Sequence, residues 1–283
     1  MTSVSASIPA QPFFIQGAAG NLFAMYYPNQ VEIAKRRDVI FLPPFAEEMN
    51  KSRRMISRQA RRLAEVGFGV LVLDLYGTGE SQGDFGEARW SIWKNDVAVA
   101  HAWLQQRGPT LISVVGLRLG ALLAMDLAQQ QDNFFERLVL WQPVLNGASM
   151  INQFLRLRLA AGMMSGAEEK ESTQSLRRII ASGQSIEVGG YELALDLVTA
   201  IDGLHIERMP SENFPPIFWL ELASEEGRSF APASQRVIER WREKGIHIDT
   251  RQVTGPGFWS SAEIAEAPEL LQATTQIFQE AVV

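Results

Sequence analysis

The chain of 283 residues carries a formal net charge of −6 and contains no cysteine, while 46% of its residues are hydrophobic. The acidic balance excludes a general electrostatic attraction to nucleic acid, and the missing thiols exclude disulfides, thiolate catalysis and cysteine metal sites. No apolar run approaches the roughly 18 residues of a membrane-spanning helix, so we expect no membrane span.

In chain order, the first predicted element is a hairpin over residues 13–28, turned by the segment from Gly17 to Asn21. Short apolar, β-rich runs follow at 39–42, 70–75, 111–115, 137–141, 217–222 and 246–253. Amphipathic segments typical of helices lie between them at 51–66, 93–107, 120–131 and 231–244. Alternating strands and helices on this scale predict an α/β fold with a mostly parallel, doubly wound sheet.

The strand pattern stops between residues 144 and 210, where helical patterns replace it. Ile151, Leu155 and Leu159 recur at four-residue spacing, which is typical of one buried helix face. We therefore predict a core formed by residues 1–143 and 211–283, with 144–210 as an inserted helical cap. Its position between two strands favours a lid over a cleft at the strand ends, rather than an insertion that closes over its own core.

Four stretches carry a resemblance to known proteins: VIFLPPFAEE (39–48), VLVLDLYGTGES (70–81), VVGLRLGA (114–121) and VTGPGFWSS (253–261). In spacing and order they resemble the oxyanion loop, the Asp-x-Arg-Gly-x-Gly-x-Ser segment, the nucleophile elbow and the histidine loop of α/β-hydrolases. Tyr76 stands where the second of these motifs usually has arginine. The resemblance covers nearly the whole chain and implies an α/β-hydrolase fold with a cap.

The stretches PPFAEEMNKSRR, GLRLGA and GPGFW are also similar to a narrower family, the exosortase A system-associated hydrolases, type 2. That resemblance implies a gene context beside exosortase and exopolysaccharide genes. It also implies a second hydrolase, encoded in the same neighbourhood, as a candidate partner protein.

The residues at the three positions of the resembled triad do not suit serine hydrolysis. Arg118 stands at the elbow where serine is expected, and its guanidinium stays protonated, so it cannot attack a carbonyl. Gly257 stands where the base is expected, and Glu225 or Glu226 offers the acid. The three histidines, His101, His205 and His247, follow no strand end, and we interpret them as structural or exposed. The triad is therefore predicted to be degenerate and the protein to be a pseudoenzyme in serine chemistry.

Three hypotheses describe what Arg118 does instead. Glu47 or Glu48 could neutralise it and fill a closed site. Alternatively, Arg118 could bind the carboxylate or phosphate of an anionic small molecule. In a third hypothesis Glu47 or Glu48 acts as a general base on water, with Arg118 as oxyanion clamp, although the neighbouring cation should lower the pKa of either carboxyl.

The expected lining of the binding site consists of Arg118, Phe45, Glu47, Glu48, Phe258 and Trp259. No group of residues has metal-ligand spacing, and no phosphate loop is present, so we expect neither a metal nor a cofactor. The basic segment 50–63 is interpreted as a solvated helix face rather than a docking surface. The first residues lack the pattern of a signal peptide, which together with the missing cysteines predicts a cytoplasmic location.

Overall fold

The computed structural model describes residues 8–31, 35–165, 171–210 and 214–280. Its main element is an eight-stranded sheet with the strand order β1-β2-β4-β3-β5-β6-β9-β10. The first two strands pair antiparallel, β2 pairs antiparallel with β4, and all later neighbours are parallel. The strands are β1 (Gln11–Gln16), β2 (Asn21–Tyr27), β3 (Arg37–Leu42), β4 (Gly69–Leu73), β5 (Leu111–Leu117), β6 (Leu138–Trp141), β9 (Ile217–Ala223) and β10 (Ile248–Thr254). The doubly wound, mostly parallel sheet predicted from the sequence is confirmed.

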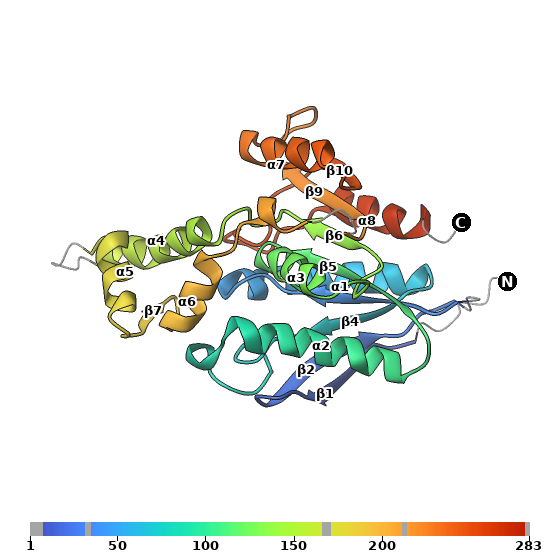
Figure 1. The fold of residues 1–283 in the computed structure, drawn as a ribbon, viewed down its shortest axis with the longest axis horizontal. Helices are drawn as coiled ribbons and strands as arrows, with labels where there is room; N and C mark the ends of the chain where they lie inside the picture. The colour runs from blue at the N-terminus through green and yellow to red at the C-terminus, as the bar shows by residue number, and fades with distance from the viewer. Residues whose placement is uncertain (1–7, 32–34, 166–170, 211–213, 281–283) are drawn as a thin grey trace.

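Helices cover both faces of the sheet (Figure 1). The sheet separates two apolar core clusters, one under the helices of each face. One face carries α1 (Glu47–Glu65) and α8 (Pro268–Glu280), which contact each other. The other face carries α2 (Trp90–Gln106), α3 (Leu119–Gln130) and α7 (Pro232–Glu243). Strands β3, β5 and β6 are almost wholly buried, because parallel strands covered on both faces need apolar side chains in both directions.

The segment between β6 and β9 forms a lobe beside the sheet, drawn in yellow-green to orange in Figure 1. It contains α4 (Gly147–Ser165), α5 (Thr173–Ala181), the hairpin β7 (Ile186–Val188) and β8 (Tyr191–Leu193), and α6 (Leu195–Asp202). Two short 3-10 turns complete the chain, η1 (Phe85–Glu87) and η2 (Ile206–Arg208). Ile151 and Leu155 on α4 are fully buried, as their spacing predicts. Residues 1–7, 32–34, 166–170, 211–213 and 281–283 of the predicted domain ranges lie outside the described residues.

Candidate functional site: a cationic elbow beside a buried carboxyl

Arg118 occupies the single-residue turn between β5 and α3. Its backbone angles are φ 55° and ψ −112°, a region that residues with a Cβ rarely adopt. Hydrogen bonds hold the turn on both sides: the Arg118 amide donates to the Trp141 carbonyl at 3.0 Å, and the Val144 amide donates to the Arg118 carbonyl at 3.3 Å. Strand β6 and the loop after it therefore fix the strained residue at the carboxyl end of the sheet.

Two glycines allow the helix to begin so close to the sheet. A Cβ on Gly120 would lie 2.5 Å from the carbonyl oxygens of Leu42 and Pro43, and one on Gly116 would lie 2.5 Å from the Cα of Ala121. Neither position tolerates a larger residue without a backbone shift. The glycine pair of the sequence motif is thus explained by close packing, and that packing is independent of which side chain stands at position 118.

The Arg118 side chain makes two contacts among the described residues. Its Nε donates to Oε1 of Glu48 at 3.3 Å, which is longer than the roughly 2.7–2.9 Å of a strong charge-assisted hydrogen bond. Its guanidinium carbon lies 5.5 Å from the ring centre of Trp259, within cation–π range. Across the described part of the chain, neither terminal nitrogen of Arg118 has a hydrogen-bond partner. The side chain is 16% exposed, so these nitrogens can meet a ligand.

Glu48 is the acid that approaches Arg118, from the first turn of α1. Its pKa is raised, because burial of the carboxyl outweighs the lowering effects of Arg118 and Lys51. The sequence analysis expected Arg118 to lower this pKa; Arg118 does so, but the cost of removing the carboxylate from water is larger and makes the net direction upward. The second oxygen, Oε2, is buried without a hydrogen-bond partner. A single long hydrogen bond therefore satisfies Glu48 incompletely.

A pocket of about 210 Å³ opens over this pair, and we call it the Arg118 pocket. Helix α1, the elbow, the loop after β10 and helix α4 all contribute to it. The lining residues are Phe45, Glu47, Glu48, Lys51, Arg118, Met150, Gln153, Phe154, Leu157, Trp259 and Ser260. Charged groups thus lie against an apolar wall that α4 supplies, which is the position expected for a lid over the strand ends.

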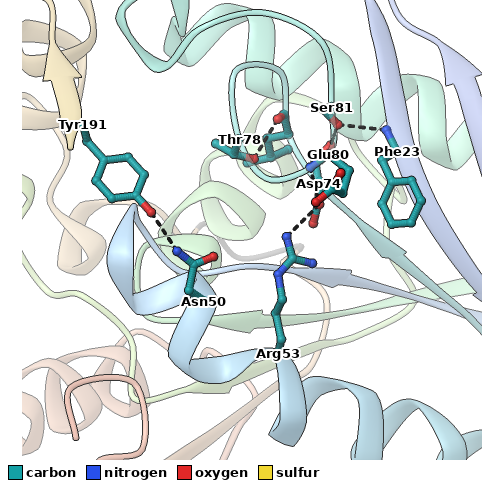
Figure 2. A network of polar contacts seen from close by, with 9 residues as sticks. Phe23, Asn50, Arg53, Asp74, Thr78, Glu80, Ser81 and Tyr191 are labelled. Atoms are coloured by element: carbon teal, nitrogen blue, oxygen red, sulfur yellow. Dashed lines mark hydrogen bonds and ion pairs between the residues drawn. The ribbon is translucent and has the colours of Figure 1, made fainter. Parts of the chain in front are cut away.

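Polar contacts on both sides fix helix α1, and with it Glu48 (Figure 2). Asn50 donates to the hydroxyl of Tyr191 on β8 at 3.0 Å, and Arg53 pairs with Asp74 in the loop after β4 at 2.9 Å. The same carboxylate accepts the amide of Glu80 at 3.0 Å. Ser81, in the same loop, donates to the Asp74 carbonyl and accepts the amide of Phe23. The network joins the lobe, α1 and the β4 loop into one support for Glu48.

The basic face of α1 is largely neutralised within the chain. Besides Arg53, both Arg54 and Arg58 pair with Glu266 in the segment before α8. The sequence analysis interpreted 50–63 as a solvated helix face, whereas these ion pairs join part of that face to the segment before α8. They leave Lys51 as the α1 cation that lines the Arg118 pocket.

The other predicted site residues are only partly brought together. Glu47 and Phe45 line the pocket, but Glu47 does not contact Arg118. Phe258 differs from the expectation: it is 1% exposed and packs into the core near Trp141, so only its neighbour Trp259 reaches the pocket. Glu225 and Glu226 are exposed, and neither lines this pocket.

Gly257 lies three residues beyond β10 and borders a second, larger hollow described below.

The histidines lie where the sequence analysis expects structural ones. His101 is buried, and its Nε2 lies 2.8 Å from the Phe134 carbonyl. Burial lowers the pKa of His101, and the hydrogen bond to Phe134 offsets this only in part. His205 contacts Asn146 in the lobe. Neither His101 nor His205 lines the Arg118 pocket.

Several residues at the site escaped the sequence analysis. Lys51, Met150, Phe154 and Leu157 line the pocket because α1 and α4 face each other across it, which no local pattern reveals. Glu221 is a buried carboxylate inside β9, and an acidic residue in the apolar run IFWLEL was the signal that could have identified it. Within the described ranges, no group of three potential metal ligands is present, and no helix has the length and apolarity needed to cross a membrane.

Comparisons with known proteins agree with the fold of the chain. The family model described as "Serine aminopeptidase, S33" matches residues 35–178, just over half of the chain. The fold is similar to that of Est1E from Butyrivibrio proteoclasticus with bound ferulic acid, at a TM-score of 0.68 and 17% identity, covering 95% of this chain and 96% of Est1E. It is also similar to a thermostable carboxyl esterase from Bacillus coagulans, at a TM-score of 0.64 and 14% identity, covering 98% and 100% of the two chains.

A third solved structure, an α-beta serine hydrolase homologue from Coxiella burnetii, aligns at a TM-score of 0.58 and 14% identity, covering 99% of this chain and all of that one. A comparison with curated proteins found no significant match. The family match and the sheet order lead to one conclusion: the chain belongs to the serine aminopeptidase S33 family and has the α/β-hydrolase fold.

Proposed function

We propose that the protein binds an anionic small molecule in the Arg118 pocket and performs no serine-triad hydrolysis. The observation that carries this proposal is the state of Arg118: a fixed guanidinium whose terminal nitrogens have no partner in the described structure and face a pocket with apolar walls. Two adjacent guanidinium nitrogens can bind a carboxylate or phosphate through parallel hydrogen bonds. Lys51 adds positive charge, and the amino-terminal end of α3 favours an anion beside it.

The contact with Glu48 supports an anion-binding role of Arg118 better than a closed site in which Glu48 neutralises Arg118, an arrangement we call a plug. A plug needs the acid to satisfy the guanidinium, whereas here one bond of 3.3 Å is made through Nε. An arriving anion disfavours the negative charge of Glu48, and because the pKa of Glu48 is already raised, uptake of a proton from solvent by this carboxyl costs little. The apolar side chains of Met150, Phe154 and Leu157 suit an acyl chain or another apolar body behind the anionic head.

Binding should be detectable as thermal stabilisation by anionic lipids, acyl phosphates or nucleotide sugars, because a ligand of the folded state raises its stability by mass action. Arg118→Gln should weaken the affinity of such a ligand by at least about tenfold, since the charge-assisted bonds are lost while most of the volume remains. The matched control is Arg156→Gln, which removes an exposed arginine of α4 outside the pocket lining. Undiminished stabilisation of Arg118→Gln would contradict the proposal.

The chain should not react as a serine hydrolase. Arg118 at the elbow offers no nucleophile, and no histidine approaches it within the described residues. Purified protein should therefore leave short p-nitrophenyl esters intact and should not be labelled by a fluorophosphonate probe. Stoichiometric labelling of a single mapped serine would contradict this prediction.

A second candidate function is hydrolysis with Glu48 as the general base. The raised pKa of Glu48 and its unpartnered Oε2 favour it, because a base needs a pKa nearer to neutrality and a free oxygen. Ester hydrolysis without probe labelling, abolished by Glu48→Gln, would support this function over pure binding. We rank it second because no described group is placed to position the attacking water.

A further inference from the structure

A second hollow of about 910 Å³ lies at the carboxyl ends of β6, β9 and β10, and we call it the β9–β10 groove. Its lining includes Gln142, Glu221, Arg228, Gln252, Gly257 and Trp259. Trp259 borders both this groove and the Arg118 pocket, so the two spaces adjoin at one side chain. A ligand seated on Arg118 that extends past Trp259 enters the groove.

Gln142 presents a fixed hydrogen-bond donor to the groove. Its backbone has a positive φ of 44°, and its amide donates to the Leu220 carbonyl at 2.8 Å. Its side-chain oxygen accepts the Leu222 amide at 2.9 Å, so the oxygen is used within the protein. The side-chain nitrogen makes no hydrogen bond to any part of the chain that the structure describes. Two bonds to β9 therefore hold a free NH₂ group in place.

Glu221 presents a fixed acceptor. The residue is only 4% exposed, and one carboxylate oxygen accepts the indole Nε1–H of Trp219 at 2.9 Å. The other oxygen has no hydrogen-bond partner among residues 8–31, 35–165, 171–210 and 214–280. Because Glu221 lines the groove, the hydroxyl of a ligand can donate a hydrogen bond to this oxygen.

These groups define the chemistry of an occupant. The opposite charges of Glu221 and Arg228 favour an occupant without net charge, and Glu221 accepts hydrogen bonds, whereas Gln142, Gln252 and Arg228 donate them. A hydroxyl group both donates and accepts, so an array of hydroxyls meets both demands at once. The flat indole of Trp259 offers a face for the C–H surface of a saturated ring.

We propose that the β9–β10 groove binds a neutral polyhydroxylated ring, so that the ligand of the combined site is a sugar that carries a carboxylate or phosphate. The anionic substituent lies on Arg118, and the ring lies beyond Trp259 against Gln142 and Glu221. The anionic half of this ligand rests on the proposed function, whereas the hydroxylated half rests on the groove alone.

Isothermal titration with a panel of neutral disaccharides, a hexose phosphate and inorganic phosphate tests the proposal. Wild-type protein should bind a neutral disaccharide from the panel and should bind the hexose phosphate about tenfold or more tightly than inorganic phosphate. Glu221→Gln should weaken the neutral sugar and the hexose phosphate by about tenfold and leave inorganic phosphate unchanged, since it removes the acceptor but keeps the shape. Glu225→Gln is the matched control, because Glu225 is exposed and lines neither space.

A second variant keeps the test valid if Glu221→Gln folds poorly. Gln142→Glu retains an oxygen for the Leu222 amide but replaces the free donor with an acceptor and adds a negative charge, so it should weaken the same two ligands. Neutral-sugar binding that is unchanged in both variants, or absent from the wild type, would overturn the groove proposal. If Arg118→Gln alone leaves hexose phosphate binding unchanged, the anion proposal fails while the groove proposal stands.

Discussion

Arg118→Ala should lower the free energy of unfolding by about 2–4 kcal/mol near pH 8, because it leaves the Glu48 carboxyl buried without its cation. The loss should shrink as the pH falls, since the pKa of Glu48 is already raised and rises further once Arg118 no longer lowers it. A protonated Glu48 needs no cation. Urea unfolding followed at several pH values measures both the size and the pH dependence of the effect.

A double-mutant cycle separates the ion pair from the loss of volume. Arg118→Met refills most of the space, and adding Glu48→Gln should recover most of the remaining stability, giving a coupling energy of about 1–3 kcal/mol. Thr199→Ala on α6 is an independent reference for an exposed substitution outside this contact. Equal stabilities of wild type and Arg118→Ala at every pH would show that solvent, rather than Glu48, compensates the guanidinium.

Asp96→Asn should raise the free energy of unfolding by about 2–3 kcal/mol at pH 8. Asp96 is fully buried on α2, accepts only the Tyr76 amide at 2.9 Å, and leaves Oδ1 without a partner. Burial raises its pKa from 3.8 to about 6, and the Tyr76 amide opposes this only in part. A pKa shift of about two units corresponds to about 3 kcal/mol of stability that the ionised Asp96 costs the folded state. An uncharged asparagine at this position does not carry that cost.

The sign of the pH dependence follows from linkage. Between pH 3.8 and about 6 the native state binds a proton that the unfolded state has lost, so wild-type stability falls as the pH rises through this window. The advantage of Asp96→Asn should therefore be small near pH 4 and complete above about pH 6. Asp126→Asn is the matched control: Asp126 is also buried but pairs with Lys94 and Trp90, so its replacement should not stabilise the protein. A pH-independent effect of Asp96→Asn would contradict the assignment.

The sequence predicted the sheet well because its signals are local. The apolar run of β5 followed by Gly116 and Gly120 required a strand and a helix in close contact, and the structure shows backbone oxygens that exclude any Cβ there. Helix α4 also begins close to the point where the strand pattern of the sequence stops. Helix α8 was not predicted, although its buried face, with Leu270, Leu271 and Phe278, covers one side of the sheet.

The site was less predictable because it depends on side-chain directions that single residues decide. Glu47 and Glu48 are equivalent in the sequence, and only the start of α1 after Ala46, with its φ of 51°, turns Glu48 rather than Glu47 toward Arg118. Phe258 and Trp259 are likewise adjacent, yet the loop after β10 sends one into the core and the other into the pocket. The groove escaped prediction because Gln142 and Glu221 are joined only through the pairing of β6 with β9.

Ala46, Arg118 and Gln142 all have positive φ, and they follow β3, β5 and β6, three neighbouring strands of the sheet. Each such residue costs on the order of 1–3 kcal/mol, and the rest of the fold supplies that energy whatever side chain is present. The ends of these strands therefore form a rigid backbone framework whose conformation does not depend on the attached side chains. A substitution at one of these positions can therefore change the group presented at the strand ends without a change of architecture.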